Sequence, residues 1–486
     1  ACTRGTVDQA VAIDEVKRFI AQQDLDAATR FVPEKVIPKV DGAFDQQIAI
    51  IGGGPAGLSC AYYLAEKGYR PTVFEKERRL GGMLENGLPS FRLEKDVVQA
   101  EIDVLREMGV QFRCGVEVGK DVTIAQLREQ GYQGFYVAVG LQSGGRLNIP
   151  GDDAQDVTAG IDFMRRVNGG QETKLEGRVV VIGGGNIAAD VARTAVRCGA
   201  ESVDLYCLES YDDMPMGPED RGECERDGIT IHAGWGQTEI VAENGHAAGI
   251  RFRKCLRVKD DQGRFAPVFD DNDACEAACA TVLYCIGQKV DWRQLLTGTA
   301  VTFNPNGTAQ VDPVTYQTAE PGIFAGGDAV TGQKFAIDAI AAGKEGAISL
   351  HRFVQKAALT IGRNRRQFVE LDKENALIPV GFDNTPRQRI GYNEALRRTF
   401  RDERIAFTAQ QVQKETARCL SCGASVVDPN KCIGCGVCTT KCAFDAIHLH
   451  RERPECTHMI PAEDKMKAIL PYMVKREIKI RKAGKK

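Results

Sequence analysis

Two glycine-rich turns and one run of four cysteines predict an α/β protein with two Rossmann-like dinucleotide-binding domains and a small C-terminal iron–sulfur module. Each turn follows a short β-branched run and precedes a segment of helical periodicity, which is the order of a strand, a tight turn and a helix. The cysteines have C-x2-C-x2-C-x3-C spacing near the end of the chain. Each of these patterns has a chemical use.

The first turn lies in IAIIGGGPAGLSCAYYLAEKGYRPTVFEK, from Ile48 to Lys76. Gly52, Gly54 and Gly57 form the G-x-G-x-x-G pattern. The first glycine permits a tight turn, the second lets a pyrophosphate approach the backbone, and the third lets helix and strand pack closely. The helix N-terminus offers free N–H groups to the phosphates. Glu75 ends the next strand, where an acid accepts hydrogen bonds from a ribose diol.

The second turn lies in RVVVIGGGNIAADVARTAVRCGAESVDLYCLES. Gly183, Gly185 and Ala188 form the G-x-G-x-x-A variant, and we expect a helix from about Asn186 to Cys198. The strand SVDLYCL then ends at Glu209. The chain therefore contains two complete dinucleotide-binding units.

A third segment, GIFAGGDAV, predicts a strand, a Gly-Gly-Asp turn ending in Asp328, and a helix rich in small residues. Such a segment can bring an acid and a helix N-terminus to the middle of a long cofactor. Two dinucleotides suit a flavin that stays bound and a nicotinamide that exchanges. A hydride can then pass from nicotinamide C4 to flavin N5, so that the protein supplies position and electrostatics and needs no catalytic acid, base or nucleophile.

Composition excludes several classes of protein. The formal net charge of −3 argues against a nucleic-acid-binding protein, and no apolar run is long enough to span a membrane. The N-terminus lacks a signal-peptide pattern. Several of the 17 cysteines lie in apolar runs, where a thiol behaves as a small hydrophobic group, so we expect a reducing, cytoplasmic location.

Four motifs together resemble the glutamate synthase small-subunit family, which has the two-dinucleotide disulfide-oxidoreductase fold. They are GGGPAGL with Glu75, GGML at residues 81–84, GGGNIAAD and GIFAGGDA. The resemblance implies an FAD site formed by Gly52, Gly54, Pro55, Ala56, Gly57, Glu75, Lys76, Gly82, Met83, Gly327 and Asp328. It implies a nicotinamide site formed by Gly183, Gly185, Asn186, Ile187 and Ala188, and Glu209 at the end of the next strand is a further candidate ligand of that nucleotide.

The resemblance also implies that the FAD domain is interrupted by the NAD(H) domain. We expect an N-terminal helical remnant of an iron–sulfur region, a first FAD part, the NAD(H) domain, a second FAD part, a surface extension, a ferredoxin-like iron–sulfur module and a basic tail. In that order, the seven parts are expected to cover residues 1–45, 46–172, 173–285, 286–355, 356–415, 416–456 and 457–486.

The sequence departs from the family pattern at the end of the second strand of the nicotinamide domain. NADPH-using members usually carry two adjacent arginines there, and this chain has Leu208 and Glu209. A glutamate repels a 2′-phosphate and binds a 2′-hydroxyl, so we predict NAD(H) as the nucleotide. At the N-terminus, only Cys2 matches the family's iron–sulfur region.

The C-terminal cysteines Cys432, Cys435, Cys438 and Cys442 have the spacing of a bacterial ferredoxin, which favours [4Fe–4S] over zinc. The sequence resembles half of a ferredoxin, with Ala443 where a proline is usual and with DAIHLH as a closing strand. Cys419 and Cys422 form a further C-x2-C pair. Cys419, Cys422 and Cys456 could be ligands of a second cluster. That cluster would need a non-cysteine group or a distant thiol as its remaining ligand, so it stays an alternative.

We therefore predict an NAD(P)H-dependent oxidoreductase that exchanges electrons between NAD(H), FAD and a [4Fe–4S] cluster. No region remains for a separate substrate domain, so we expect the other redox subunits of a larger complex as partners, with no nucleic acid and no membrane insertion. Three alternatives remain: an NADPH-dependent glutamate synthase small subunit, an electron-bifurcating flavoprotein subunit, and a non-enzymatic redox relay or scaffold.

Overall fold

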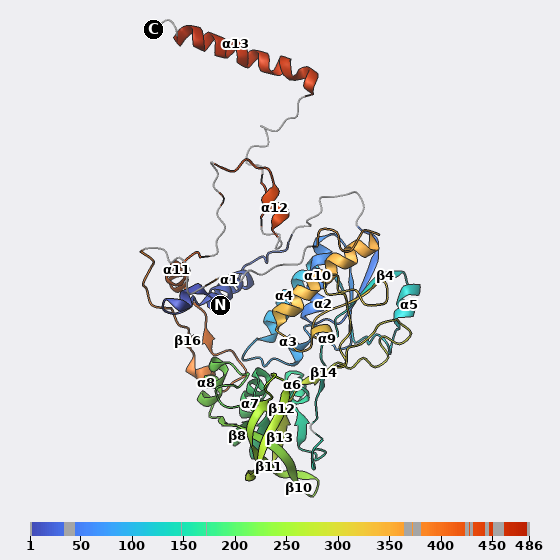
Figure 1. The fold of residues 1–486 in the computed structure, drawn as a ribbon, viewed down its shortest axis with the longest axis vertical. Coiled ribbons are helices and arrows are strands. Elements are labelled where there is room, and N and C mark those ends of the chain that lie inside the picture. The colour runs from blue at the N-terminus through green and yellow to red at the C-terminus, as the bar shows by residue number, and fades with distance from the viewer. Residues whose placement is uncertain are drawn as a thin grey trace. The chain divides into compact units, whose positions relative to one another are not determined.

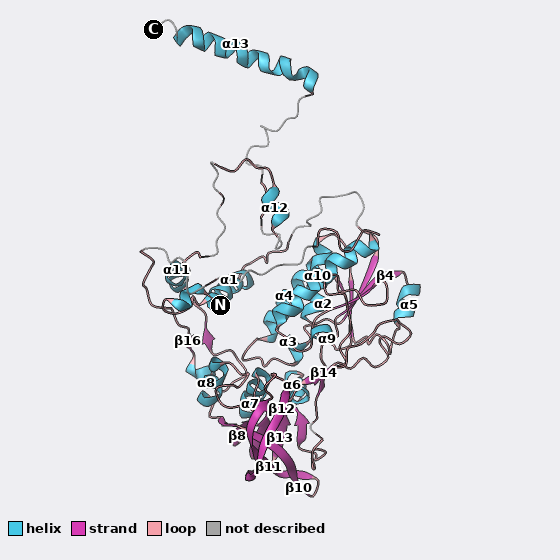
Figure 2. Cartoon of the chain, viewed as in Figure 1, coloured by secondary structure: helices cyan, strands magenta, loops and turns pink. Residues whose placement is uncertain are grey.

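The computed structural model describes residues 2–33, 44–146, 148–171, 173–363, 372, 381–422, 427, 431–442, 447–450 and 461–483. The described residues up to 363 together with 381–420 form one compact unit, and residue 372 together with those from 421 onward forms a second. Figure 1 shows the chain from blue to red, and Figure 2 shows its helices and strands. Each unit is described by itself.

The first sheet of the larger unit is parallel, with strand order β15-β4-β1-β2-β3. Its strands are β1 (Gln47–Ile51), β2 (Thr72–Glu75), β3 (Gln111–Cys114), β4 (Tyr132–Val137) and β15 (Ile323–Ala325). Helices α2 (Pro55–Glu66), α4 (Lys95–Glu107) and α10 (Ala336–Val354) pack in one core with Ile48 and Ile50, while Ala49 and Ile51 belong to another. A strand buried on both faces is continuously apolar, as residues 48–51 of β1 are. The short helices α3 (Met83–Asn86), α5 (Ile124–Glu129) and α9 (Asp328–Thr331) complete this domain.

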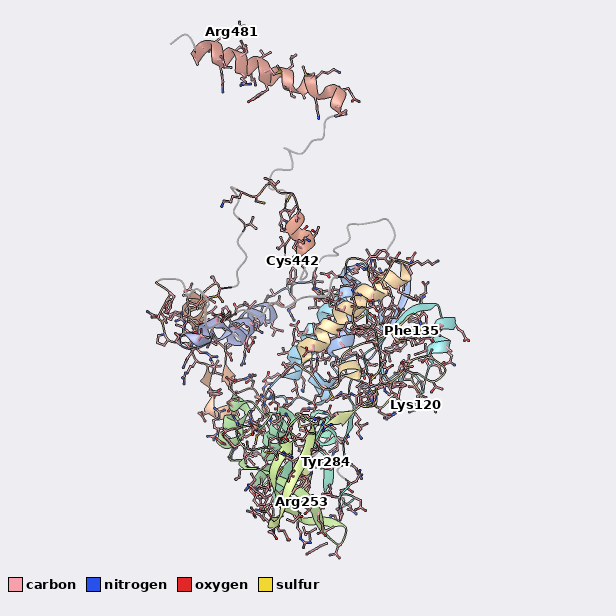
Figure 3. The ribbon with its side chains drawn as sticks, viewed as in Figure 1. Lys120, Phe135, Arg253, Tyr284, Cys442 and Arg481 are labelled. Carbon is pink, nitrogen blue, oxygen red and sulfur yellow. The ribbon has the colours of Figure 1, made fainter. Side chains whose placement is uncertain are left out.

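The second sheet is also parallel, with order β6-β13-β7-β8-β9. Its strands are β6 (Val157–Ala159), β7 (Arg178–Ile182), β8 (Ser202–Cys207), β9 (Thr230–Ala233) and β13 (Thr281–Tyr284). One core contains α6 (Gly160–Asn168), α7 (Asn186–Arg197) and α8 (Pro218–Arg226). The other lies under an antiparallel sheet of β10 (Trp235–Glu243), β11 (His246–Lys259) and β12 (Phe265–Ala278). Phe135 on β4 and Tyr284 on β13 mark the two parallel sheets in Figure 3.

The chain leaves the first sheet and returns to it, as the interrupted-domain prediction requires. The outward and return segments pair as β5 (Ser143–Gly144) and β14 (Gln288–Lys289), after which β15 joins the first sheet. The first boundary needs a correction. We expected the first FAD part to extend to residue 172, but β6 and α6 belong to the second sheet and its cores. The boundary lies near Pro150 and Gly151, a turn-forming pair that precedes β6.

The segment expected as a surface extension is anchored to the larger unit. Its described part contains β16 (Gly391–Tyr392), the 3-10 turn η2 (Glu394–Leu396), β17 (Arg404–Ile405) and α11 (Ala409–Ala417). It packs beside the N-terminal elements η1 (Thr3–Thr6) and α1 (Ile13–Leu25). Arg4 donates to the carbonyl of Arg418 at 3.0 Å, and Glu415 accepts from the backbone N–H of Ala12 at 2.8 Å. All three charged side chains are buried.

The smaller unit contains α12 (Val437–Lys441), the 3-10 turn η4 (Ala462–Asp464) and α13 (Lys465–Ala483). The basic tail therefore includes a helix, which the charge pattern alone did not predict. The expected closing strand is not seen in residues 447–450, and the rest of DAIHLH, Ala443 and Cys456 lie outside the described residues.

Candidate functional site

The first glycine turn has the geometry that its pattern predicts. Gly52 follows β1 with φ of +109°, and a Cβ there would lie 2.4 Å from the carbonyl oxygen of Ala138. A Cβ at Gly57 would lie 2.0 Å from the carbonyl oxygen of Gly52. A side chain at Gly52 would therefore push the turn away from the end of β4, and one at Gly57 would separate α2 from the turn and the sheet. Pro55 is the first residue of α2, where its fixed φ suits a helix start.

A second glycine loop approaches this turn closely. Gly82 has φ of +55°, and a Cβ there would lie 2.7 Å from the Cα of Gly54. Gly54 is the N-cap of α2, and Gly82 is the N-cap of α3. Glycine at both positions leaves backbone exposed between two helix starts. Such backbone fits a pyrophosphate, because the N–H groups of a first helical turn lack partners within the helix.

Glu75 lies at the carboxyl end of β2 and is 7% exposed. Its Oε2 accepts a hydrogen bond from the N–H of Gly53 at 2.6 Å, and its Oε1 accepts one from Glu77 at 2.8 Å. Burial raises the pKa of Glu75, and the two N–H donors partly offset this. Each carboxylate oxygen has a further lone pair, so the group can still accept from a ribose hydroxyl.

The Gly-Gly-Asp segment follows β15, far along the chain from the first glycine turn, and contacts the same site. Gly327 has φ of +70°, and a Cβ there would lie 3.0 Å from the Cβ of Ala56 on α2. Asp328 begins α9 and accepts a hydrogen bond from the N–H of Lys334 at 3.3 Å. Burial raises the pKa of Asp328.

The second glycine turn repeats the plan of the first. Gly183 has φ of +141°, and a Cβ there would lie 2.6 Å from the carbonyl oxygen of Cys285. Gly185 has open space where a Cβ would be, and Ala188 is buried against the sheet. The Oε2 of Glu209 lies 2.8 Å from the Cβ position of Gly184. The carboxylate of Glu209 therefore lies against the second glycine turn.

One cavity of about 980 Å³ contacts both turns and the Gly-Gly-Asp segment. Of the predicted residues, its lining includes Gly52, Gly54, Pro55, Ala56, Glu75, Lys76, Gly82, Met83, Gly185, Asn186, Ile187, Gly327 and Asp328. Gly57, Gly183, Ala188 and Glu209 are outside the lining. The first three shape the turns through close packing.

Motif-based reasoning missed an ion pair at this cavity. Asp190 on α7 is 5% exposed and lines the cavity, and its Oδ1 lies 2.5 Å from the Nε of Arg92. Arg92 belongs to the FAD domain, so the pair joins the two domains. Burial raises the pKa of Asp190 to about 6. In the sequence, Asp190 lies about one helical turn after the second glycine turn. Nothing near it in the sequence identifies Arg92 as its partner.

A lysine below the cavity floor was also missed. The Nζ of Lys95 donates to the carbonyl oxygens of Leu84 and Leu88 at 2.8 and 2.6 Å. Both leucines line the cavity. Burial lowers the pKa of Lys95 to about 8. The side chain therefore fixes the loop that follows Met83.

In the smaller unit, the predicted cluster ligands lie around α12. Gly434 and Gly436 have φ of +68° and +76°, the left-handed conformation that a tight ligand loop needs. Cys432, Cys435 and Cys438 are exposed thiols, and Cys442 follows α12 directly (Figure 3). Within the described residues, no three His, Cys, Asp or Glu side chains are gathered closely enough to hold a metal ion. The donor set suits iron–sulfur chemistry, and metal binding would complete the fold of the loop.

The second cysteine pair is divided between the two units. Cys419 follows α11 in the larger unit, two residues before the boundary, and Cys422 belongs to the smaller unit. We expected a module beginning at residue 416, but residues 416–420 pack with the larger unit. In the described part of the chain, no helix is both long enough and apolar enough to cross a membrane.

Comparison with known proteins agrees with this geometry. The family model described as pyridine nucleotide-disulphide oxidoreductase matches residues 46–343, and the model of a 4Fe-4S binding domain matches residues 425–447. FAD, a pyridine nucleotide and a [4Fe–4S] cluster are the cofactors of these domains. The FprA oxidoreductase from Mycobacterium tuberculosis in complex with NADPH shares the fold, with a TM-score of 0.55 at 18% identity over 64% of this chain and 85% of that chain.

Several curated relatives are redox subunits. The NADP(+)-dependent formate dehydrogenase subunit beta of Moorella thermoacetica is 34% identical over 87% of this chain and 63% of its own length. The NAD-dependent dihydropyrimidine dehydrogenase subunit PreT of Escherichia coli O157:H7 is 30% identical over 73% of this chain and 78% of its own. The glutamate synthase [NADPH] small chain of Halomonas elongata is 32% identical over 71% and 74%.

The predicted resemblance to the glutamate synthase small-subunit group is confirmed. This chain spans less than two thirds of the length of the formate dehydrogenase subunit. The two family matches cover both dinucleotide-binding domains and the cysteine run. The chain therefore belongs to the pyridine nucleotide-disulphide oxidoreductase family, with a 4Fe-4S binding domain near its C-terminal end.

Proposed function

We propose that this chain is an NADH-linked electron-transfer subunit that exchanges electrons with partner redox subunits. When bound, the flavin would exchange a hydride with the nicotinamide, and the cluster would carry single electrons to or from the partners. The observation that carries the proposal is the shared cavity, because both glycine turns open into the same space. Hydride donor and acceptor can then meet without a separate substrate domain.

The first glycine turn, Glu75, Lys76, Gly82, Met83, Gly327 and Asp328 are assigned to FAD in this proposal. The second glycine turn and Glu209 are assigned to the nicotinamide dinucleotide. Cys432, Cys435, Cys438 and Cys442 are assigned to one [4Fe–4S] cluster. A role for Cys419 and Cys422 in a second cluster stays an alternative, which iron analysis can decide.

The choice of NADH rests on Glu209. Its carboxylate lies against Gly184 of the nucleotide turn, where a 2′-phosphate would meet a negative charge. The names of the relatives include both nucleotides, so they do not decide the question.

The partners are proposed to be other subunits of a larger complex in the cytoplasm. The names of three relatives describe subunits or chains of larger enzymes, which supports this. A tagged chain prepared without oxygen from its native cells should retain co-purifying redox proteins, flavin and iron.

The decisive experiment is anaerobic mixing of the purified chain with NADH and with NADPH. NADH should bleach the flavin absorbance, and a low-temperature paramagnetic resonance spectrum of the reduced protein should show a reduced [4Fe–4S] cluster. A chain that binds flavin and iron but is reduced by neither nucleotide would contradict the proposal and favour a redox relay.

A further inference from the structure

The loop between α3 and α4 of the FAD domain reaches into the nicotinamide domain. Phe91 in this loop is 4% exposed, and its ring lies under the guanidinium groups of Arg193 and Arg197 at 4.8 and 4.0 Å. Both arginines belong to α7, the helix that follows the second glycine turn. An apolar ring from one domain is thus covered by two cations of the other, an arrangement that contributes attraction when water is excluded.

The next residue, Arg92, pairs with two elements of the nicotinamide domain. Its Nε contacts Asp190 on α7 at 2.5 Å, and its Nη2 contacts Asp220 on α8 at 2.8 Å. Within the nicotinamide domain, Arg193 and Arg197 share the Oδ2 of Asp227 at 2.8 and 2.7 Å, and Asp227 is 1% exposed. The ion cluster is therefore buried and joins α7 to the end of α8.

A segment far along the chain closes over this cluster. We call residues 397–404 the strap. Its Glu403 is 6% exposed and pairs with Arg226 of α8, and its Oε1 lies 3.8 Å from the Nη2 of Arg193. Arg398 donates to the carbonyl oxygen of Asp227 at 2.5 Å, and the carbonyl oxygen of Thr399 accepts from Arg197 at 2.8 Å.

The strap also holds the FAD domain. Arg404 donates to the carbonyl oxygen of Arg92 at 2.9 Å, and the N–H of Asp402 donates to Glu94 at 3.3 Å. Asp402 further pairs with Arg18 of α1 at 3.1 Å. The strap therefore contacts both dinucleotide-binding domains at the place where Phe91 and Arg92 join them.

We propose that Glu403 and Arg398 are positioning residues, which fix the orientation of the nicotinamide domain against the FAD domain and so set the rate of hydride transfer. This inference rests on the proposed function, and it adds a role for a segment outside both nucleotide turns. The chain crosses between the two domains twice, through the short segments that pair as β5 and β14. Such a link leaves rotation to be limited by side-chain contacts, and a small misplacement of the reacting atoms is costly.

The test compares Glu403→Gln with Glu394→Gln. Glu394 lies in the same extension, its side chain is 71% exposed, and it lies 3.8 Å from Arg397. Arg398→Ala is a second, independent strap variant. Two readouts are needed. One is the rate of flavin bleaching at saturating NADH, with the dissociation constant of NADH and the FAD content measured alongside. The other is the distance distribution between spin-labelled non-natural amino acids at positions 107 and 243, one in each domain.

Both strap variants should broaden the distance distribution and slow bleaching by about tenfold, with FAD content and NADH affinity within about twofold of the wild type. Glu394→Gln should change neither readout. An unchanged distribution, or a broadened one with an unchanged rate, would overturn the proposal. If NADH fails to bleach even the wild type, the proposed function fails, but the distance distributions still decide whether the strap holds the domains.

Discussion

At the scale of single residues, we propose that the acid that follows the second strand of the nicotinamide domain selects the nucleotide. Glu209→Arg would place a cation where a 2′-phosphate binds, so kcat/KM for NADPH should rise relative to NADH by about tenfold or more. Steady-state reduction of an artificial electron acceptor with each nucleotide measures the ratio. Glu201→Arg, an exposed change just before the same strand, should leave it unaltered. A wild type that already prefers NADPH would contradict this role of Glu209.

A second residue-scale prediction concerns Asp190. Burial raises the pKa of its carboxyl from 3.8 to about 6, so the folded chain holds this proton more tightly than the unfolded chain does. The stability that it contributes is complete below pH 3.8 and is lost as the pH rises through about 6. Asp190→Asn cannot titrate. The free energy of unfolding of the wild type relative to this variant should therefore fall between about pH 4 and pH 7, as urea titrations can measure.

The matched control for this titration is Asp162→Asn on α6, whose side chain is 55% exposed. This substitution should change the free energy of unfolding by at most about 1 kcal/mol, because it removes only an exposed ion pair with Arg165. If the free energy of unfolding of the wild type relative to Asp190→Asn did not vary with pH, the carboxyl would have the same pKa in the folded and unfolded chain. That result would contradict the prediction.

At the scale of elements, the third glycine of the first turn keeps α2 against the sheet. Gly57→Ala would put a Cβ 2.0 Å from the carbonyl oxygen of Gly52. It should cost about 1–3 kcal/mol in the free energy of unfolding and reduce FAD retention. The matched control is Gly222→Ala within α8, where the added Cβ meets no atom within 4 Å. That change should stabilise by roughly 0.5–1 kcal/mol, and equal effects of the two substitutions would contradict the packing argument.

The elements that sequence reasoning found are those with a local signature. The strands before both turns, the helices after them and the Gly-Gly-Asp segment follow from periodicity and glycine spacing. The Arg92–Asp190 pair joins residues 98 positions apart, and Glu403 meets Arg226 across 177 positions. Nothing local to either residue identifies its partner. The boundary before β6 was misplaced for the same reason, because β6 pairs with β13, which lies far along the chain.

At the scale of the whole molecule, nucleotide chemistry and cluster chemistry lie in separate compact units. Cys438→Ala should therefore remove iron from the smaller unit while the larger unit keeps its flavin and is still bleached by NADH. Electron delivery to a one-electron protein acceptor should fall by about tenfold or more, because the cluster is the proposed exit. Cys114→Ala, which removes an exposed thiol of the larger unit, is the matched control and should change neither iron content nor delivery. Undiminished delivery by the iron-depleted Cys438→Ala chain would mean that electrons leave directly from the flavin, and the cluster would then need another role.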